Sequence, residues 1–166
     1  MKKEYFIGIV PPEEYMERIE HFQRKWMNHL GVEPHITIKA QWGLALDKEW
    51  IDKVKEVCEN FKAFQLSLDK PLYFGDNILY LIVNSNDLIK KYFELDDFVP
   101  HLTLGKEQYG GNVSTGMTKQ ELKYMENFVE KEFTPYPSFE VTYIRISELN
   151  REKQRYEKSL NVSLSI

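Results

Sequence analysis

The sequence predicts an α+β fold, a bilobed domain of antiparallel sheets with flanking helices, whose two lobes are related by a rough pseudo-twofold axis. Segments with strand-like alternation are interspersed with amphipathic helical segments and hairpins, without the regular pattern of a parallel sheet. A five-residue pattern also occurs once in each half of the chain, which indicates that the halves resemble one another. We therefore expect a single domain over residues 1–166, with an active-site cleft between the lobes.

The repeated pattern is proline, histidine, aliphatic, threonine, aliphatic, and it occupies residues 34–38 and 100–104. Successive side chains of a strand point to opposite faces of the sheet, so the histidine and threonine share one face and the aliphatic residues share the other. Each copy thus presents an imidazole and a hydroxyl on a strand whose back is buried. Two of the four histidines stand in this pattern. By chance, roughly one histidine in a hundred would be followed by an aliphatic residue, serine or threonine, and a second aliphatic residue, even before the shared proline is counted.

The first half of the chain is expected to alternate between strands and helices. A short apolar strand over residues 5–10 precedes a helix from Pro12 to Leu30, which Gly31 would cap. The first motif forms a strand that runs toward Trp42, and a second helix follows over residues 47–61. Both helices are predicted from apolar residues that recur every three or four positions, namely Tyr15, Ile19, Phe22, Trp26 and Leu30 in the first and Trp50, Val54, Val57, Cys58 and Phe61 in the second.

The remaining elements are predicted from turn and capping signals. A hairpin over residues 64–83 turns at residues 75–77, and a short helix over residues 87–93 precedes the second motif. A glycine-bearing loop over residues 110–116 leads to a capping box at Thr118 and Glu121. That box begins a helix whose inner face is Leu122, Met125, Phe128, Val129 and Phe133. Two strands over residues 139–149 and 156–166 close the chain, joined by a charged turn that is either a solvated tip or a contact to an anionic ligand.

Composition narrows the class of protein. The formal net charge of −4 argues against indiscriminate binding to duplex nucleic acid, although it leaves room for a small nucleotide in a locally basic cleft. The single cysteine, Cys58, cannot form an internal disulfide and is expected to fill the core. No apolar run reaches the length of a membrane span, and the N-terminus does not resemble a signal peptide. We expect a cytoplasmic protein.

Two imidazoles that face one cleft form a natural acid–base pair near neutral pH. One ring takes a proton from an attacking hydroxyl or water while the other gives a proton to the leaving oxygen. Threonine hydroxyls beside them can donate hydrogen bonds to the non-bridging oxygens of a phosphodiester, where charge is concentrated. This chemistry needs neither a metal nor another cofactor.

The stretches His35-Ile36-Thr37-Ile38 and His101-Leu102-Thr103-Leu104 resemble the two signature motifs of the 2H phosphoesterase superfamily, which includes bacterial 2′-5′ RNA ligase-like proteins and cyclic phosphodiesterases. The resemblance extends over nearly the whole chain and implies a bilobed α+β fold with both motifs at the inter-lobe cleft. It implies that His35 and His101 are the general acid and base and that Thr37 and Thr103 bind the phosphate. The chain departs from the family in its shorter segment before the second motif.

The same resemblance implies the substrate class and the partners. Family members act without a metal on 2′,3′-cyclic phosphate ends, on 2′-5′ linkages or on related cyclic nucleotides. We therefore expect an RNA end or a small cyclic nucleotide or oligonucleotide as the substrate, with no membrane and no obligate protein partner.

Further residues are candidates for substrate contact. Lys39 extends the alternation of the first motif and is expected to share its face, either as a substrate-binding residue that contacts phosphate or as an ordinary surface lysine. Trp42 could stack on a base, or it could have a structural role in the core or at a hinge. Lys106 and Arg145 are additional cationic candidates.

Three alternatives stay open at this point. The same site could act on a cyclic or 2′-5′ linked signalling oligonucleotide. It could also hold RNA or a nucleotide without turnover, although a pure binding module needs no acid–base pair. A metal site made of His35, His101 and either Asp96 or Asp97 is the weakest alternative, because none of these residues stands at a recognised ligand spacing.

Overall fold

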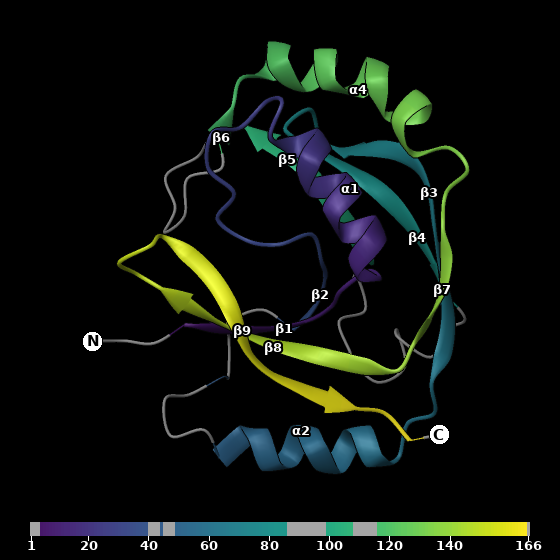
Figure 1. Ribbon diagram of the computed structural model, residues 1–166, viewed down its shortest axis with the longest axis vertical. Coiled ribbons are helices and arrows are strands. Elements are labelled where there is room, and N and C mark those ends of the chain that lie inside the picture. The colour runs from purple at the N-terminus through teal and green to yellow at the C-terminus, as the bar shows by residue number, and fades with distance from the viewer. Residues whose placement is uncertain (1–3, 40–43, 45–48, 86–98, 108–115, 166) are drawn as a thin grey trace.

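The computed structural model describes residues 4–39, 44, 49–85, 99–107 and 116–165. Within them, nine strands form one curled sheet that helices flank (Figure 1). The elements, in chain order and with the labels of Figure 1, are β1 (Tyr5–Ile9), α1 (Glu13–Gln23), β2 (Ile36–Lys39), α2 (Glu49–Glu59), β3 (Phe64–Phe74), β4 (Ile78–Ser85), β5 (His101–Glu107), β6 (Gly116–Met117), α4 (Lys119–Phe133), β7 (Ser138–Val141), β8 (Tyr143–Asn150) and β9 (Arg155–Ser163).

The strand order places the two motif strands next to each other. The sheet runs β7-β3-β4-β5-β2-β1-β8-β9, with β6 beside β5, and its pairs are antiparallel except for β5 with β6. The antiparallel pair of β2 and β5 is registered at Ile36 and Leu102, the residues that follow the motif histidines. The order therefore repeats outward from this pair, β1 lying beside β2 as β4 lies beside β5. This agrees with the pseudo-twofold arrangement that the repeated motif predicts.

The two lobes are interleaved along the chain. One contains β1, β2, β8 and β9 with α2 packed outside, and the other contains β3, β4, β5 and β7 with α1 and α4 (Figure 1). The closing segment, expected as one strand over residues 139–149, breaks at Thr142 into β7 and β8. β7 pairs with β3, whereas β8 pairs with β1 and β9, so a bend within one segment joins the lobes.

The first helix is shorter than the apolar periodicity predicts. It ends at Gln23, with Arg24 as its C-terminal cap, and not at Leu30. Met27 and Leu30 are nevertheless buried, each with 7% of its surface exposed. The apolar pattern continues because the irregular segment that follows α1 also buries side chains. Periodicity alone cannot separate such a segment from a further helical turn.

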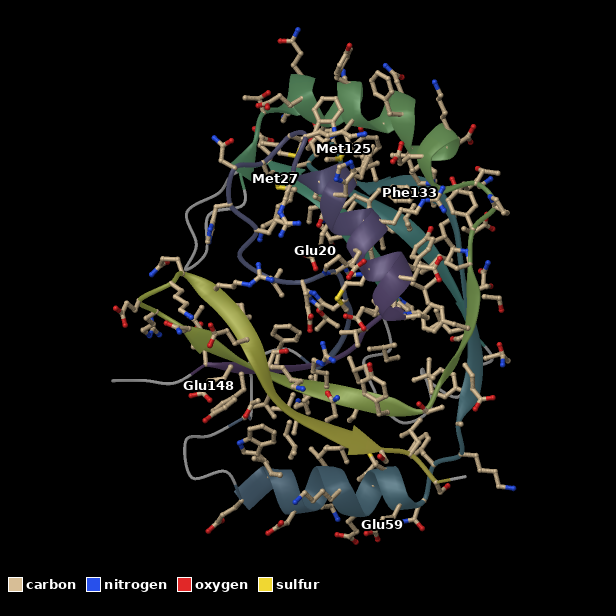
Figure 2. The ribbon with its side chains drawn as sticks, in the orientation of Figure 1. Glu20, Met27, Glu59, Met125, Phe133 and Glu148 are labelled. Carbon is tan, nitrogen blue, oxygen red and sulfur yellow. The ribbon has the colours of Figure 1, made fainter. Side chains whose placement is uncertain are left out.

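The other described helices agree with their sequence signals. Thr118 accepts a hydrogen bond from the Glu121 amide, and the Glu121 carboxylate accepts one from the Thr118 amide, which confirms the capping box. Met125 and Phe133 lie beneath α4, facing the rest of the lobe (Figure 2). Phe128 was expected on that inner face, but it lies at its edge, 39% exposed, against Trp26 and Tyr124.

Cys58 lies in the core as expected, on the face of α2 that packs against β9. Burial raises the pKa of its thiol to about 11, so the thiol stays protonated and unreactive near neutral pH. The described helices include none that is long and apolar enough to cross a membrane. The predicted helix over residues 87–93, Trp42 and most of the glycine-bearing loop lie outside the described residues.

Both motif strands carry a register shift just after their threonine. Between β1 and β2, Gly8 pairs with Thr37 but Ile7 pairs with Lys39; between β4 and β5, Tyr80 pairs with Thr103 but Leu79 pairs with Gly105. Two residues of the motif strand therefore stand against one residue of its neighbour, as in a β-bulge. Beyond each shift the alternation of side chains is reset.

The shift in β5 turns position 105 toward α4, where glycine is required by space. A Cβ on Gly105 would lie 2.7 Å from Met117 Sδ and 3.1 Å from Leu122 Cδ2, and both of these side chains are buried.

We predict that Gly105→Ala lowers the free energy of unfolding by about 1–3 kcal/mol, because the core must be displaced. Urea unfolding checks this, with the exposed Ser159→Ala on β9 as the control. An unchanged midpoint for Gly105→Ala would contradict the packing described.

Candidate active site

The two motifs meet on one face of the sheet. Because Ile36 is antiparallel to Leu102, His35 stands across from Thr103 and Thr37 stands across from His101. Ile36 and Leu102 are themselves fully buried, whereas the four polar side chains remain partly exposed. The alternation predicted from the sequence thus brings two imidazoles and two hydroxyls together.

Each imidazole is held in the same way. The Nδ1 atom of His35 lies 2.8 Å from the Glu33 carbonyl oxygen, and that of His101 lies 2.7 Å from the Val99 carbonyl oxygen. A carbonyl can only accept, so Nδ1 carries a proton in both rings and Nε2 is the atom that gains or loses one. In His35 this Nε2 lies 3.0 Å from the Thr37 hydroxyl.

Aromatic rings support both histidines from the side. Phe6 lies 4.5 Å from His35 between ring centroids, while Phe74 and Tyr80 lie 4.8 Å and 5.5 Å from His101. Gly8 leaves space beneath the first ring, since a Cβ there would lie 3.0 Å from the Ile36 carbonyl oxygen and 3.5 Å from His35 Cδ2. These contacts restrict the rings to one orientation each.

The surroundings of His35 favour its neutral form. Burial lowers the pKa of His35 below its ordinary value of 6.5, and the positive charges of His101 and Lys106 act in the same direction. The hydrogen bond to the Glu33 carbonyl and the Glu33 carboxylate oppose this effect without reversing it. At pH 7 the ring is therefore neutral, with an Nε2 that can accept a proton.

A cavity of about 280 Å³ opens beside this cluster, where the lobes meet. His35, Thr37 and Thr103 line it together with the segment that follows α1, including Met27, Leu30, Val32 and Pro34. Met27 lies just beyond the end of α1 (Figure 2). Gln23 also lines the cavity and ties α1 to the second motif strand, because its Nε2 donates a hydrogen bond to the Leu104 carbonyl at 3.0 Å. One wall is therefore largely apolar, and the opposite wall carries His35, Thr37 and Thr103. His101 is not among the lining residues and stands beside the cavity, across from Thr37.

The register shifts decide which lysine lies at the cavity. The sequence predicts that Lys39 shares the face of His35 and Thr37, but the shift after Thr37 interrupts this alternation, and Lys39 is exposed outside the cavity lining. The equivalent shift in β5 returns Lys106 to the face of Thr103, and Lys106 lines the cavity. A signal in the sequence existed, since Gly105 follows the second motif directly and glycine often marks a bulge.

The arginines of the charged turn bind protein groups. Arg155 donates to the Leu30 carbonyl, and Arg151 donates to the Glu4 carboxylate at 2.9 Å. Arg145, on β8, forms an ion pair with Glu33 at 2.5 Å. The hairpin of β8 and β9 is thereby fastened to the segment that lines the cavity, which the sequence did not predict.

The part of the chain that the structure describes contains no group of three or more histidine, cysteine, aspartate or glutamate side chains placed to hold a metal ion. The alternative with Asp96 or Asp97 falls outside the described residues.

The chain resembles several solved structures in fold, although its sequence identity to them is low. No protein-family model matches the chain, and no curated protein matches it. Among solved structures, E. coli LigT in its apo form is 16% identical with a TM-score of 0.58, and the match covers 100% of this chain and 99% of LigT. The protein TT0787 of Thermus thermophilus is 15% identical with a TM-score of 0.62 over 97% of each chain. A protein described as a phosphoesterase is 16% identical with a TM-score of 0.58 over 100% of each chain.

The chain has the fold of LigT. The likeness extends over both lobes, so the pairing of the motif strands lies within a fold shared from end to end. LigT itself has been solved in complexes with 3′-AMP, with NADP+, with ATP and with phosphate.

The neutral state of His35 predicts how stability depends on pH. Folding lowers the pKa of His35, so the neutral imidazole contributes fully to the free energy of unfolding above the pKa of the unfolded chain, about 6.5. This contribution is lost as the pH falls below that value. We predict that the wild type loses more unfolding free energy between pH 7.5 and pH 5 than His35→Gln does. Urea unfolding at both pH values measures this, with the exposed His21→Gln as the control that behaves like the wild type. Equal losses in the wild type and His35→Gln would contradict it.

Proposed function

We propose that the protein is a metal-independent phosphodiesterase of the 2H phosphoesterase superfamily. Its substrate would carry a 2′,3′-cyclic phosphate or a 2′-5′ linkage, as an RNA end or a small nucleotide. The observation that carries the proposal is the pair of imidazoles with protonated Nδ1 atoms, placed on one face with two threonine hydroxyls. The nucleotide and phosphate complexes of LigT, which shares the fold, support a nucleotide as the ligand.

For a cyclic phosphate, hydrolysis needs one proton removed and one supplied. We assign the removal to His35, whose neutral Nε2 takes a proton from the attacking water as its oxygen bonds to phosphorus. The bond from phosphorus to one ring oxygen then breaks, and that oxygen takes a proton from Nε2 of His101. Solvent exchange restores the two starting protonation states. His35 and His101 would thus be general base and general acid in this direction.

The remaining motif groups would stabilise the charge on the phosphate. Thr37 and Thr103 can each donate a hydrogen bond to a non-bridging oxygen, and the Lys106 ammonium adds a positive charge on the same face. The Thr37 hydroxyl lies 3.0 Å from His35 Nε2, so a rotation of the hydroxyl would turn it from the imidazole to the phosphate.

The cavity bears on the size of the substrate. Its volume of about 280 Å³ lies near the lower end of ligand pockets, which span roughly 300–1,000 Å³. This supports a single nucleotide or the terminal nucleotide of an RNA over a long internal stretch of strand.

The single buried cysteine supports a cytoplasmic location.

The proposed function is tested by hydrolysis of a nucleoside 2′,3′-cyclic phosphate with EDTA present. We predict that His35→Ala and His101→Ala each lose ~10²–10⁴-fold in rate, since each removes one acid–base group. His21→Ala, on the exposed side of α1, is the matched control and should retain full activity. Full turnover in either motif variant would refute the paired-histidine mechanism. Nucleotide binding without turnover in the wild type would favour the binding module instead.

The two lysines give a second test within the same assay. We predict that Lys106→Met lowers kcat/KM roughly 10- to 100-fold, the loss of one charge-assisted contact of about 1.5–3 kcal/mol. Lys39→Met should change it little, because the register shift after Thr37 turns Lys39 off the motif face and leaves it exposed. The opposite ranking would show that Lys39 reaches the phosphate and that the geometry assigned to Lys106 is incorrect.

A further inference from the structure

The carbonyl that fixes His35 lies in irregular backbone. Between the end of α1 and the start of β2 there is no strand ladder to hold Glu33. Its carboxylate instead accepts a hydrogen bond from Arg145 Nη1 at 2.5 Å, and 20% of the Glu33 side chain and 14% of the Arg145 side chain are exposed. The same residue therefore joins Arg145 through its side chain to the His35 imidazole through its main chain, 2.8 Å from Nδ1.

Arg145 is well placed to act as a fixed point. It lies in β8, in register with Gly8 of β1 on one side and Asn161 of β9 on the other. Its Nε donates to the Asn161 side-chain oxygen at 3.0 Å, and its guanidinium lies 5.9 Å from the centre of the Tyr143 ring. A guanidinium held by a hydrogen bond on one edge and by an aromatic ring of the same sheet can orient a carboxylate more firmly than an exposed lysine could.

We propose that Arg145 is a positioning residue for His35, acting through its ion pair with Glu33 to hold the carbonyl that orients the imidazole. Its effect on catalysis rests on the proposed function, whereas its effect on the imidazole does not. Arg145 itself would not touch the substrate, because its guanidinium is engaged by Glu33 and Asn161.

The pair also breaks the symmetry between the two histidines. The carbonyl that holds His101 belongs to Val99, an apolar residue that is 48% exposed and cannot form an ion pair. Two copies of one motif are thereby given different electrostatic surroundings. A reaction that needs one proton acceptor and one proton donor benefits from such a difference.

The expected electrostatic effect has a definite sign. The described groups whose charges act on the His35 ring are Glu33, which favours its protonation, and His101 and Lys106, which oppose it. Without Arg145 the Glu33 carboxylate loses its counter-charge, so Arg145→Met should raise the pKa of His35. Glu33→Gln removes the negative charge and should lower it. The double variant should lie between the two, because each change offsets the other.

The test is an NMR titration of the imidazole resonances in the wild type, Arg145→Met, Glu33→Gln and the double variant. Arg24→Met is the matched control, since it removes an ion pair with Glu20 from an arginine that caps α1 and whose own side chain is 61% exposed. We expect the titration midpoint of His35 to rise in Arg145→Met, to fall in Glu33→Gln and to lie between these values in the double variant. Arg24→Met should leave it unchanged. In parallel, the acid limb of the profile of kcat/KM against pH should move with the His35 midpoint. The kcat/KM of Arg145→Met at pH 7 should fall roughly 10- to 100-fold, because the His35 ring is misplaced.

An unchanged His35 titration in both folded single variants would overturn the proposal. If Arg145→Met fails to fold, Glu33→Gln alone decides, since it keeps the size and the main chain of the anchor. A shifted titration in a protein that hydrolyses nothing would leave Arg145 as the positioning residue and refute the proposed function. Hydrolysis by the wild type with an unshifted His35 titration in the variants would support the proposed function and refute Arg145 as the positioning residue.

Discussion

The contact on which the site depends is the antiparallel pairing of Ile36 with Leu102. Both side chains are fully buried, so neither strand can slip by one residue without exposing its aliphatic face and burying its histidine and threonine. This single register brings His35 across from Thr103 and Thr37 across from His101. Because the pair lies at the junction of the lobes, the same contact that joins them also builds the cluster of polar groups. Stability and chemistry are thus tied to one point in the sheet.

Everything outside that contact serves to hold the cluster in place or to complete it. The register shift after each threonine ends the alternation, buries Gly105 under α4 and returns Lys106 to the cavity. The hairpin of β8 and β9 is fastened to the segment behind His35 by Arg155 and by the main chain of Tyr156, whose amide donates to the Gly31 carbonyl at 2.8 Å. Aromatic rings confine both imidazoles. The outcome is a polar site on rigid strands, facing an apolar wall.

Local patterns in the sequence were sufficient for much of this structure. Alternation in the two motifs predicts which side chains are buried, the capping box predicts the start of α4, and the turn at Gly75 predicts the hairpin of β3 and β4. The sequence could not place features that depend on distant partners. The interrupted alternation at Lys39 could not be predicted because a β-bulge is set by the neighbouring strand, and the early end of α1 is hidden by apolar residues that stay buried beyond it. The ion pair of Glu33 with Arg145 joins residues 112 positions apart, and no periodicity marks it.

If both motifs hold a single phosphate between them, titration of the protein with inorganic phosphate should show it in the imidazole resonances of the four histidines. We predict that His35 and His101 respond along one saturation curve with a common Kd, while His21, exposed on α1, and His29, whose ring contacts the Gln154 carbonyl, do not respond. Thr37→Val and Thr103→Val should both weaken that common Kd. Two separate curves for His35 and His101, or a response from only one of them, would contradict the claim that the strand pairing creates one anion site.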